Sequence, residues 1–122
     1  MPMRWLPALL CLTAAPALAE PWACAFTVEC NVTEGCDSTG FQAQVIAADH
    51  AGDLFLRTAM GASPLTRLTP EGALPVSYAG ATHDGIAELL TIEADRTAIL
   101  TLHMFDGTAA AITHFGTCEE MT

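Results

Sequence analysis

The chain has 122 residues, of which 14 are Asp or Glu and four are Arg or Lys, so its formal net charge at pH 7 is −10. This length suits a single domain, because typical domains contain about 100–200 residues. The negative charge argues against binding to nucleic acid or to anionic lipid, since phosphate groups and this chain repel one another. No lysine is present, which excludes catalysis through a Schiff base or a serine–lysine pair.

Residues 1–19 have the pattern of a secretory signal peptide. Arg4 supplies a positive charge, residues 6–12 form an apolar run, and Ala17-Leu18-Ala19 matches a small-x-small cleavage site. The apolar run is shorter than the about 20 residues that a membrane-spanning helix needs. We therefore expect cleavage after Ala19 and export of one domain, residues 20–122, to the bacterial periplasm or the extracellular space, with no membrane span.

Four cysteines follow the predicted cleavage site, and an even number in a small exported domain indicates two disulfide bonds. Residues 24–32 alternate like a β-strand, and one face would carry Cys24, Phe26, Val28, Cys30 and Val32. Such a strand separates Cys24 from Cys30 by about 20 Å, whereas bridged Cα atoms lie about 4.4–6.8 Å apart. We therefore predict the pairs Cys24–Cys118 and Cys30–Cys36. The alternative is Cys24–Cys36 together with Cys30–Cys118. The cysteine spacing fits neither a CxxC redox motif nor a familiar zinc ligand set.

Beyond the first strand, short alternating runs separated by turns that contain Gly or Pro predict a series of β-strands. The runs cover residues 41–48, 54–56, 65–69, 73–79 and 86–93. Thr69-Pro70-Glu71-Gly72 suits a type I turn. Helix is an alternative for residues 53–60 and for residues 86–93, although the β-branched residues and short length of the second run favour a strand.

Residues 97–105 and 108–115 flank Asp106-Gly107 and predict a β-hairpin with a two-residue type I′ turn. In that register Phe105 pairs with Thr108, His103 with Ala110, and Ile99 with His114. The face expected in the core carries Leu100, Leu102, Met104, Ala109, Ala111 and Phe115. The opposite face is too apolar to be simply solvated, so a second layer covers it or it binds a ligand. Its members are Ile99, Thr101, His103, Phe105, Ile112 and His114. Together these elements predict an all-β fold, a small disulfide-stabilised antiparallel barrel or sandwich of six to eight strands.

The four histidines form no convincing catalytic or metal site. His103 and His114 would lie about 13 Å apart along the strand, too far for both to bind one zinc ion at about 2.0–2.1 Å. His83 beside Asp84 is the best loop candidate for ligand contact or acid–base chemistry, and His50 beside Asp49 is a weaker one. The serines lack the Gly-x-Ser-x-Gly elbow, and a charged strand end explains Glu88, Glu93 and Asp95. We expect no catalytic residue, no metal site and no cofactor.

The leading hypothesis is a non-enzymatic, inhibitor-like binding domain that acts on a basic exported protein or another envelope component. Its acidic charge would favour encounters with a cationic partner. The alternative is a carrier that holds a small apolar ligand inside the barrel, and a small hydrolase that uses His83 or His103 is the third hypothesis. The candidate ligand contacts are His83, Asp84, His103, Phe105 and His114.

Overall fold

A computed structural model describes residues 20–48, 52–105 and 107–121. The predicted signal peptide, residues 1–19, and His50 lie outside these ranges. Among the described residues, no helix is long and apolar enough to cross a membrane. The residues in these ranges form nine strands: β1 Trp22–Asn31, β2 Gly35–Ser38, β3 Gln42–Ala48, β4 Asp53–Thr58, β5 Gly61–Arg67, β6 Val76–Ala81, β7 Ala87–Ile92, β8 Thr97–Phe105 and β9 Ala109–Glu120.

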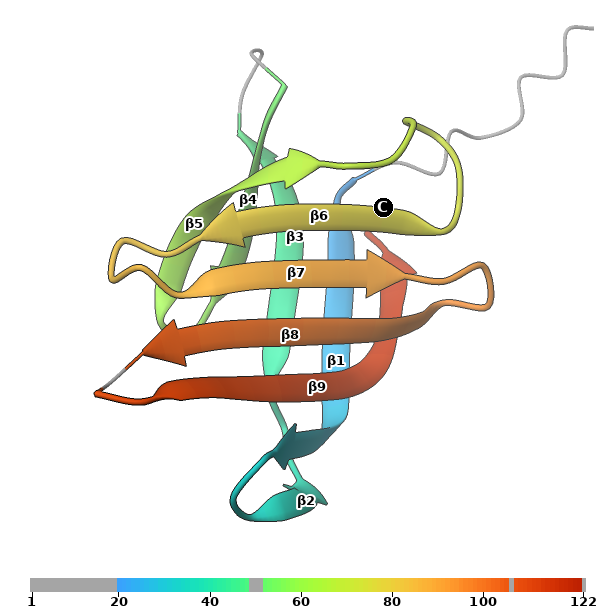
Figure 1. The fold of residues 1–122 in the computed structure, drawn as a ribbon. Helices are drawn as coiled ribbons and strands as arrows, with labels where there is room; N and C mark the ends of the chain where they lie inside the picture. The colour runs from blue at the N-terminus through green and yellow to red at the C-terminus, as the bar shows by residue number, and fades with distance from the viewer. Residues whose placement is uncertain (1–19, 49–51, 106, 122) are drawn as a thin grey trace, which may run out of the picture.

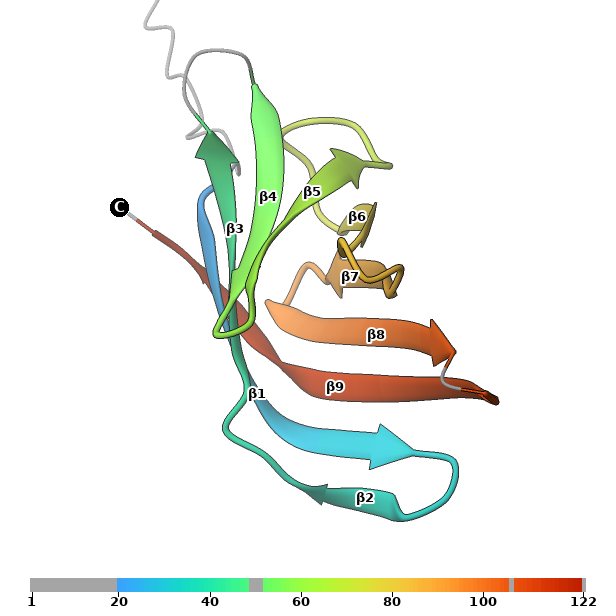
Figure 2. The same ribbon diagram turned by 90° about the vertical axis from the view of Figure 1, so that its left-hand side faces the viewer.

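Eight of the strands close into an antiparallel barrel (Figure 1). From β3 to β9 each strand pairs with the next along the chain, and β1 pairs with both β3 and β9. The edge of β1 that does not pair with β9 is shared by two strands, because residues 22–25 pair with β3 and residues 28–31 pair with β2. Strand β2 is therefore a ninth strand, in a hairpin that extends from one edge of the molecule (Figure 2). The prediction of a small antiparallel barrel is confirmed.

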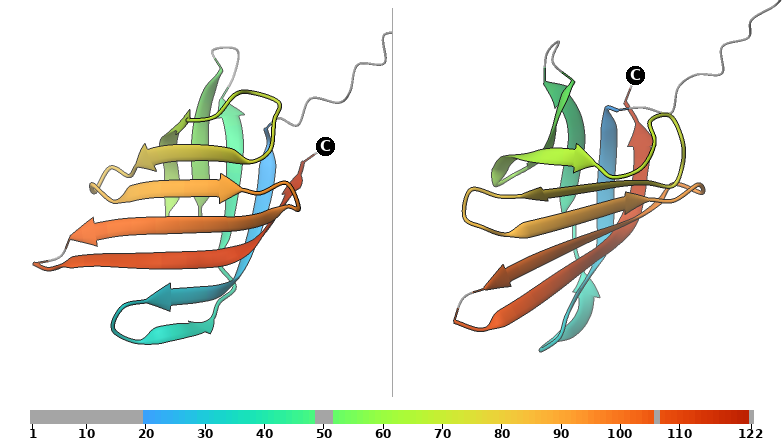
Figure 3. Two further views of the ribbon diagram at one scale, coloured as in Figure 1. Left: turned by 45° about the vertical axis from the view of Figure 1, so that its right-hand side comes forward. Right: turned by 45° about the horizontal axis from the view of Figure 1, so that its top comes forward.

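The interior of the barrel is filled by side chains. Strands β6–β9 cross over β1, β3 and β4 (Figure 3), and the inward-facing residues of the two groups meet between them. Burying a large apolar side chain contributes about 1.5–3 kcal/mol, so this core is the main source of stability. The largest fully buried side chains are Trp22, Tyr78, Phe26, Leu56, Leu90, Ile92, Leu100 and Val45.

Two disulfide bonds join strands that are already paired. Cys24 lies directly opposite Cys118 in the β1–β9 ladder, and Cys30 lies opposite Cys36 in the β1–β2 hairpin. Both predicted pairs are confirmed, and the alternative pairing is wrong. Disulfide bonds indicate an oxidising, non-cytoplasmic compartment.

A polar network closes the end of the barrel where the chain enters β1. Arg67 Nη2 lies 2.7 Å from each carboxylate oxygen of Glu20, and the Tyr78 hydroxyl donates to the same carboxylate at 2.5 Å. Trp22 Nε1 donates to the Tyr78 hydroxyl at 3.2 Å. Burial alone raises the pKa of Glu20, but the hydrogen bonds from Arg67 and Tyr78 outweigh it, so this pKa lies below its ordinary value. Burial and the bond to Glu20 raise the pKa of Tyr78.

The predicted register of the last hairpin is wrong by one residue. Phe105 pairs with Ala109, His103 with Ala111, and Leu100 with His114. The loop therefore contains three residues, 106–108, instead of the predicted two. Because side chains alternate between faces, a slip of one residue inverts the whole strand. His114 consequently faces the interior, and Phe115 lies on the outer surface with 40% of its area exposed.

The predicted alternation of the first strand also fails beyond Phe26. Cys24 and Phe26 are buried as expected, but a β-bulge interrupts the β1–β9 register between Phe26 and Val28. A bulge adds one residue to one strand and so reverses the facing of those that follow. Val28 is therefore exposed, and Glu29 lies opposite the inward-facing His114.

The remaining differences concern the limits of the strands. Residues 53–58 form strand β4, so the helical alternative for residues 53–60 is wrong. Strand β7 confirms the strand interpretation of residues 86–93. Strand β5 begins at Gly61, four residues before the start of the predicted run 65–69. Strand β6 begins at Val76, three residues after the start of the predicted run 73–79. Strand β2 was not predicted, because only four exposed residues form it.

Candidate binding site

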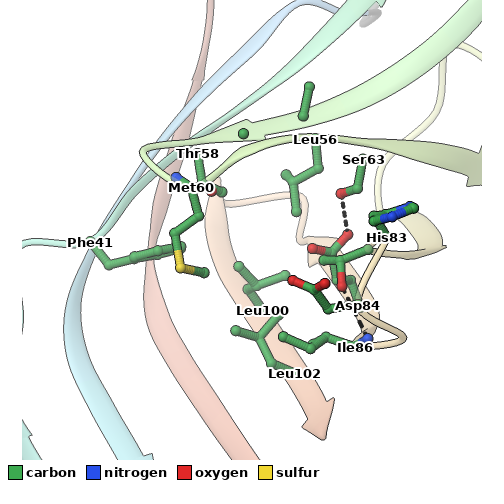
Figure 4. Close-up of a pocket in the computed structure, with 14 residues that line it drawn as sticks. Phe41, Leu56, Thr58, Met60, Ser63, His83, Asp84, Ile86, Leu100 and Leu102 are labelled. Atoms are coloured by element: carbon green, nitrogen blue, oxygen red, sulfur yellow. Dashed lines mark hydrogen bonds between the residues drawn. The ribbon is translucent and has the colours of Figure 1, made fainter.

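A cavity opens at the end of the barrel formed by the β4–β5 turn and the β6–β7 loop (Figure 4). Its volume is about 130 Å³. Most of its wall is apolar, and the polar groups that line it are Thr58, Ser63, Thr82, His83, Asp84 and Glu88. The apolar lining side chains are Phe41, Leu56, Met60, Ile86, Leu100 and Leu102.

The cavity exists because the β5–β6 ladder is short. Only residues 65–67 of β5 pair with β6, whereas residues 61–65 pair with β4. Pro64 has no N–H group to continue the ladder. Gly80 allows the two strands to approach at the last pair, since a Cβ there would clash with the carbonyl of Pro64. Beyond this point β5 and β6 separate, and the inner face of β5 between Gly61 and Ser63 lines the opening.

Glu88 places a carboxylate among the apolar residues of this cavity. The residue is only 7% exposed, and its Oε2 accepts a hydrogen bond of 2.7 Å from Ser63 Oγ, which is itself 6% exposed. Burial raises the pKa of Glu88, because the ionised form loses hydration, and the bond from Ser63 opposes this only in part. Glu88 shares the inward face of β7 with Leu90 and Ile92, and the period-2 pattern of this run was the signal that could have identified it as buried.

The β6–β7 loop carries His83 and Asp84 at the mouth of the cavity. Both side chains are exposed and line the opening, together with Met60 of the β4–β5 turn. Two hydrogen bonds between Thr82 and Ile86 hold the loop: the Thr82 N–H donates to the Ile86 carbonyl, and the Ile86 N–H donates to the Thr82 hydroxyl oxygen. The two loop residues that the sequence singled out therefore lie at one site with Ser63 and Glu88. The interpretation of Glu88 as part of a charged strand end is wrong, because its side chain is buried in this cavity.

His114 lies deeper in the barrel, next to the cavity wall. Its ring stacks on Phe41 with 4.5 Å between ring centroids, and its Nε2 lies 3.4 Å from Glu29 Oε1. Burial lowers the pKa of His114, while the carboxylate of Glu29 acts in the opposite direction. The Nδ1 atom is buried without a hydrogen-bond partner. His114 is therefore part of the core that supports Phe41, one of the residues lining the cavity.

The other two sequence candidates lie elsewhere. His103 is exposed on the outer face of β8, and Phe105 is 78% exposed at the end of that strand. His103 and His114 thus lie on opposite faces of the hairpin, which separates them more completely than the predicted register did. In the described part of the chain, no three His, Cys, Asp or Glu side chains are grouped closely enough to hold a metal ion.

Comparison with known proteins identifies no relative. No protein-family model matches the chain, and neither a curated protein sequence nor a solved structure is significantly similar to it.

Proposed function

We propose that this protein is a non-enzymatic exported binding domain that captures a basic protein at the open end of its barrel. The observation that carries the proposal is the buried Glu88 carboxylate in a mainly apolar cavity, within a chain of net charge −10. The negative charge attracts a cationic partner over a distance, and the cavity supplies a contact of defined shape once the partner arrives.

A hydrolase is less well supported by the same residues. Ser63, His83 and Glu88 line one cavity, but the Ser63 hydroxyl donates its hydrogen bond to the Glu88 carboxylate. In a Ser–His–acid triad a histidine accepts the serine hydroxyl at about 2.6–3.2 Å and is itself oriented by the acid, and within the described ranges no hydrogen bond joins His83 to Ser63 or to Glu88. The bond from Ser63 orients the Glu88 carboxylate, and the pair lacks the histidine of a hydrolase triad.

A carrier of a lipid-sized ligand is also less well supported. Trp22, Tyr78 and Phe26 fill the interior, and the end cavity of about 130 Å³ is smaller than the about 300–1,000 Å³ of typical small-molecule sites. It has room for one side chain of a partner.

The proposal is tested by titrating poly-L-lysine into isotopically labelled protein at about 0.01 M salt, where the Debye length is about 30 Å. We expect binding that weakens with added salt, with NMR shifts of the amides of Gly61, Ser63 and Ile86. Poly-L-glutamate serves as the negative control.

Two single-charge variants test whether the site, and not the overall charge, controls binding. Asp84→Asn removes a charge at the mouth of the cavity, and Glu93→Gln removes one from the exposed turn at the opposite end of β7. We expect Asp84→Asn to weaken the binding of poly-L-lysine clearly, and Glu93→Gln to leave it nearly unchanged. Equal losses in the two variants, or an absence of shifts around the cavity, would refute the proposal.

A further inference from the structure

We infer that the open-end cavity binds a primary alkylammonium group of about the length of a lysine side chain, with Glu88 as its counter-ion. This inference rests on the proposed function and specifies the chemical group that the site recognises. Four features of the cavity lead to it: the balance of charge, the free oxygen of Glu88, the aromatic content of the wall and the volume.

The cavity contains negative charge without a fixed positive charge. Glu88 and Asp84 both line it, whereas Arg57, Arg67 and Arg96 do not. His83 is the basic residue of the lining and is exposed at the mouth. A buried carboxylate is costly unless a cation pairs with it. A cation supplied by a ligand would provide that pairing.

The state of the Glu88 carboxylate favours ammonium over guanidinium. Ser63 already donates to Oε2, and no described residue donates to Oε1, so Oε1 keeps more of its acceptor capacity for a ligand. A guanidinium group binds carboxylates best through two parallel bonds, one to each oxygen. An ammonium group is a compact charge that needs only one. The bond from Ser63 is thus a specificity device as well as a means of orienting Glu88.

The walls favour a primary amine over a quaternary one. Sites for quaternary ammonium ions are cages of several aromatic rings, and in the described lining Phe41 is the aromatic residue. Leu56, Ile86, Leu100 and Leu102 form instead an aliphatic surface suited to a hydrocarbon stem. The volume of about 130 Å³ is close to that of an engineered cavity of about 150 Å³ that takes a benzene molecule. The four-carbon stem of lysine is of similar bulk.

The inference is tested first with small probes on the wild-type protein. We expect n-butylamine, which reproduces the stem and charge of lysine, to bind in NMR titrations and to shift the amides of Ser63, Ile86 and Glu88. Binding of n-butanol, n-butyrate and butyltrimethylammonium is expected to be much weaker, because each lacks either the positive charge or the N–H donors. Equal binding of n-butylamine and butyltrimethylammonium would overturn the inference.

Two variants then separate the roles of the two polar residues. Glu88→Gln keeps the shape and an acceptor for Ser63 but removes the charge, and we expect it to weaken n-butylamine binding about 10- to 100-fold. Ser63→Ala frees the second oxygen of Glu88, and we expect it to raise the affinity for n-butylguanidine relative to n-butylamine. This second variant also tests the inference if Glu88→Gln does not fold. An unchanged affinity ratio in Ser63→Ala would contradict the specificity argument.

The two proposals fail in different ways. If n-butylamine binds and requires Glu88 while poly-L-lysine does not bind, the cavity takes a free small amine and the proposed protein partner is wrong. If poly-L-lysine binds Glu88→Gln as tightly as the wild-type protein, the binding domain stands and the ammonium site is wrong.

Discussion

The two disulfide bonds are expected to contribute unequally to stability. Cys24 and Cys118 are 94 positions apart in the sequence, whereas Cys30 and Cys36 are six apart. In the chain-entropy description, a cross-link restricts the unfolded chain more strongly as the closed loop lengthens. The long bridge is then worth about 4.7 kcal/mol and the short one about 2.3 kcal/mol. Removing the long bridge should therefore cost about 2 kcal/mol more than removing the short one.

The measurement is urea unfolding of Cys24→Ala/Cys118→Ala and Cys30→Ala/Cys36→Ala, followed by the fluorescence of the buried Trp22. Since a small domain has a total stability of about 5–15 kcal/mol, the first variant should be close to unfolded or strongly destabilised. Cys24 and Cys118 are both buried, so alanine also leaves a small void. Reduction of the Cys30→Ala/Cys36→Ala variant breaks only the Cys24–Cys118 bond and keeps its sulfur atoms, so it separates this packing loss from the cross-link. Equal losses for the two bonds, or a larger loss for Cys30–Cys36, would refute the reasoning.

Three further predictions concern the packing and the buried ionisable groups. Gly116→Ala should destabilise the protein by about 1–3 kcal/mol in urea unfolding, because its Cβ would clash with the backbone of Ala25 and Phe26; Gly40→Ala, with open space around it, should change stability by less than about 0.5 kcal/mol. Because burial raises the pKa of Glu88, the folded state holds this proton more tightly than the unfolded chain, and stability should decline as pH rises from the ordinary value of 4.5 through the folded pKa. Glu88→Gln should remove that decline. If the wild-type protein and Glu88→Gln instead show parallel profiles of stability against pH, Glu88 is hydrated in the folded state and the prediction is wrong. Because burial lowers the pKa of His114, stability should be lost as pH falls below the ordinary value of 6.5 and through the folded pKa. His114→Gln should remove this loss in thermal unfolding, whereas the exposed His103→Gln should retain it; the same profile in both variants would contradict the assignment to His114.

The features determined by the sequence itself are those that depend on neighbouring residues. Strict alternation along 97–105 and the exposed turn residues between the runs specify strands, because a strand places successive side chains on opposite faces. Local geometry also excludes one disulfide pairing, since one extended segment keeps Cys24 and Cys30 too far apart to bond. Arithmetic on a single strand was enough to exclude that pairing, and the structure confirms the predicted pairs.

The facing of the last strand was decided by tertiary structure. Asp106-Gly107 suits a two-residue turn, and that turn would bury Phe115 and expose His114. The structure uses a three-residue loop, so the more polar side chain of the pair is inside. Its partners come from elsewhere: Glu29, turned inward by the bulge of β1, and Phe41, which follows β2. Neither partner is visible in the sequence of the hairpin.

The candidate site shows the same division. The sequence identifies His83 and Asp84 as loop residues of interest, but Glu88 and Ser63 lie on separate strands 25 positions apart. Whether an inward-facing glutamate is buried, and what it contacts, depends on where β5 and β6 separate. That separation follows from the closure of the barrel, because closure sets which residues of distant strands meet at its open end. Local pattern therefore determined the strands, and the long-range packing of those strands created the cavity.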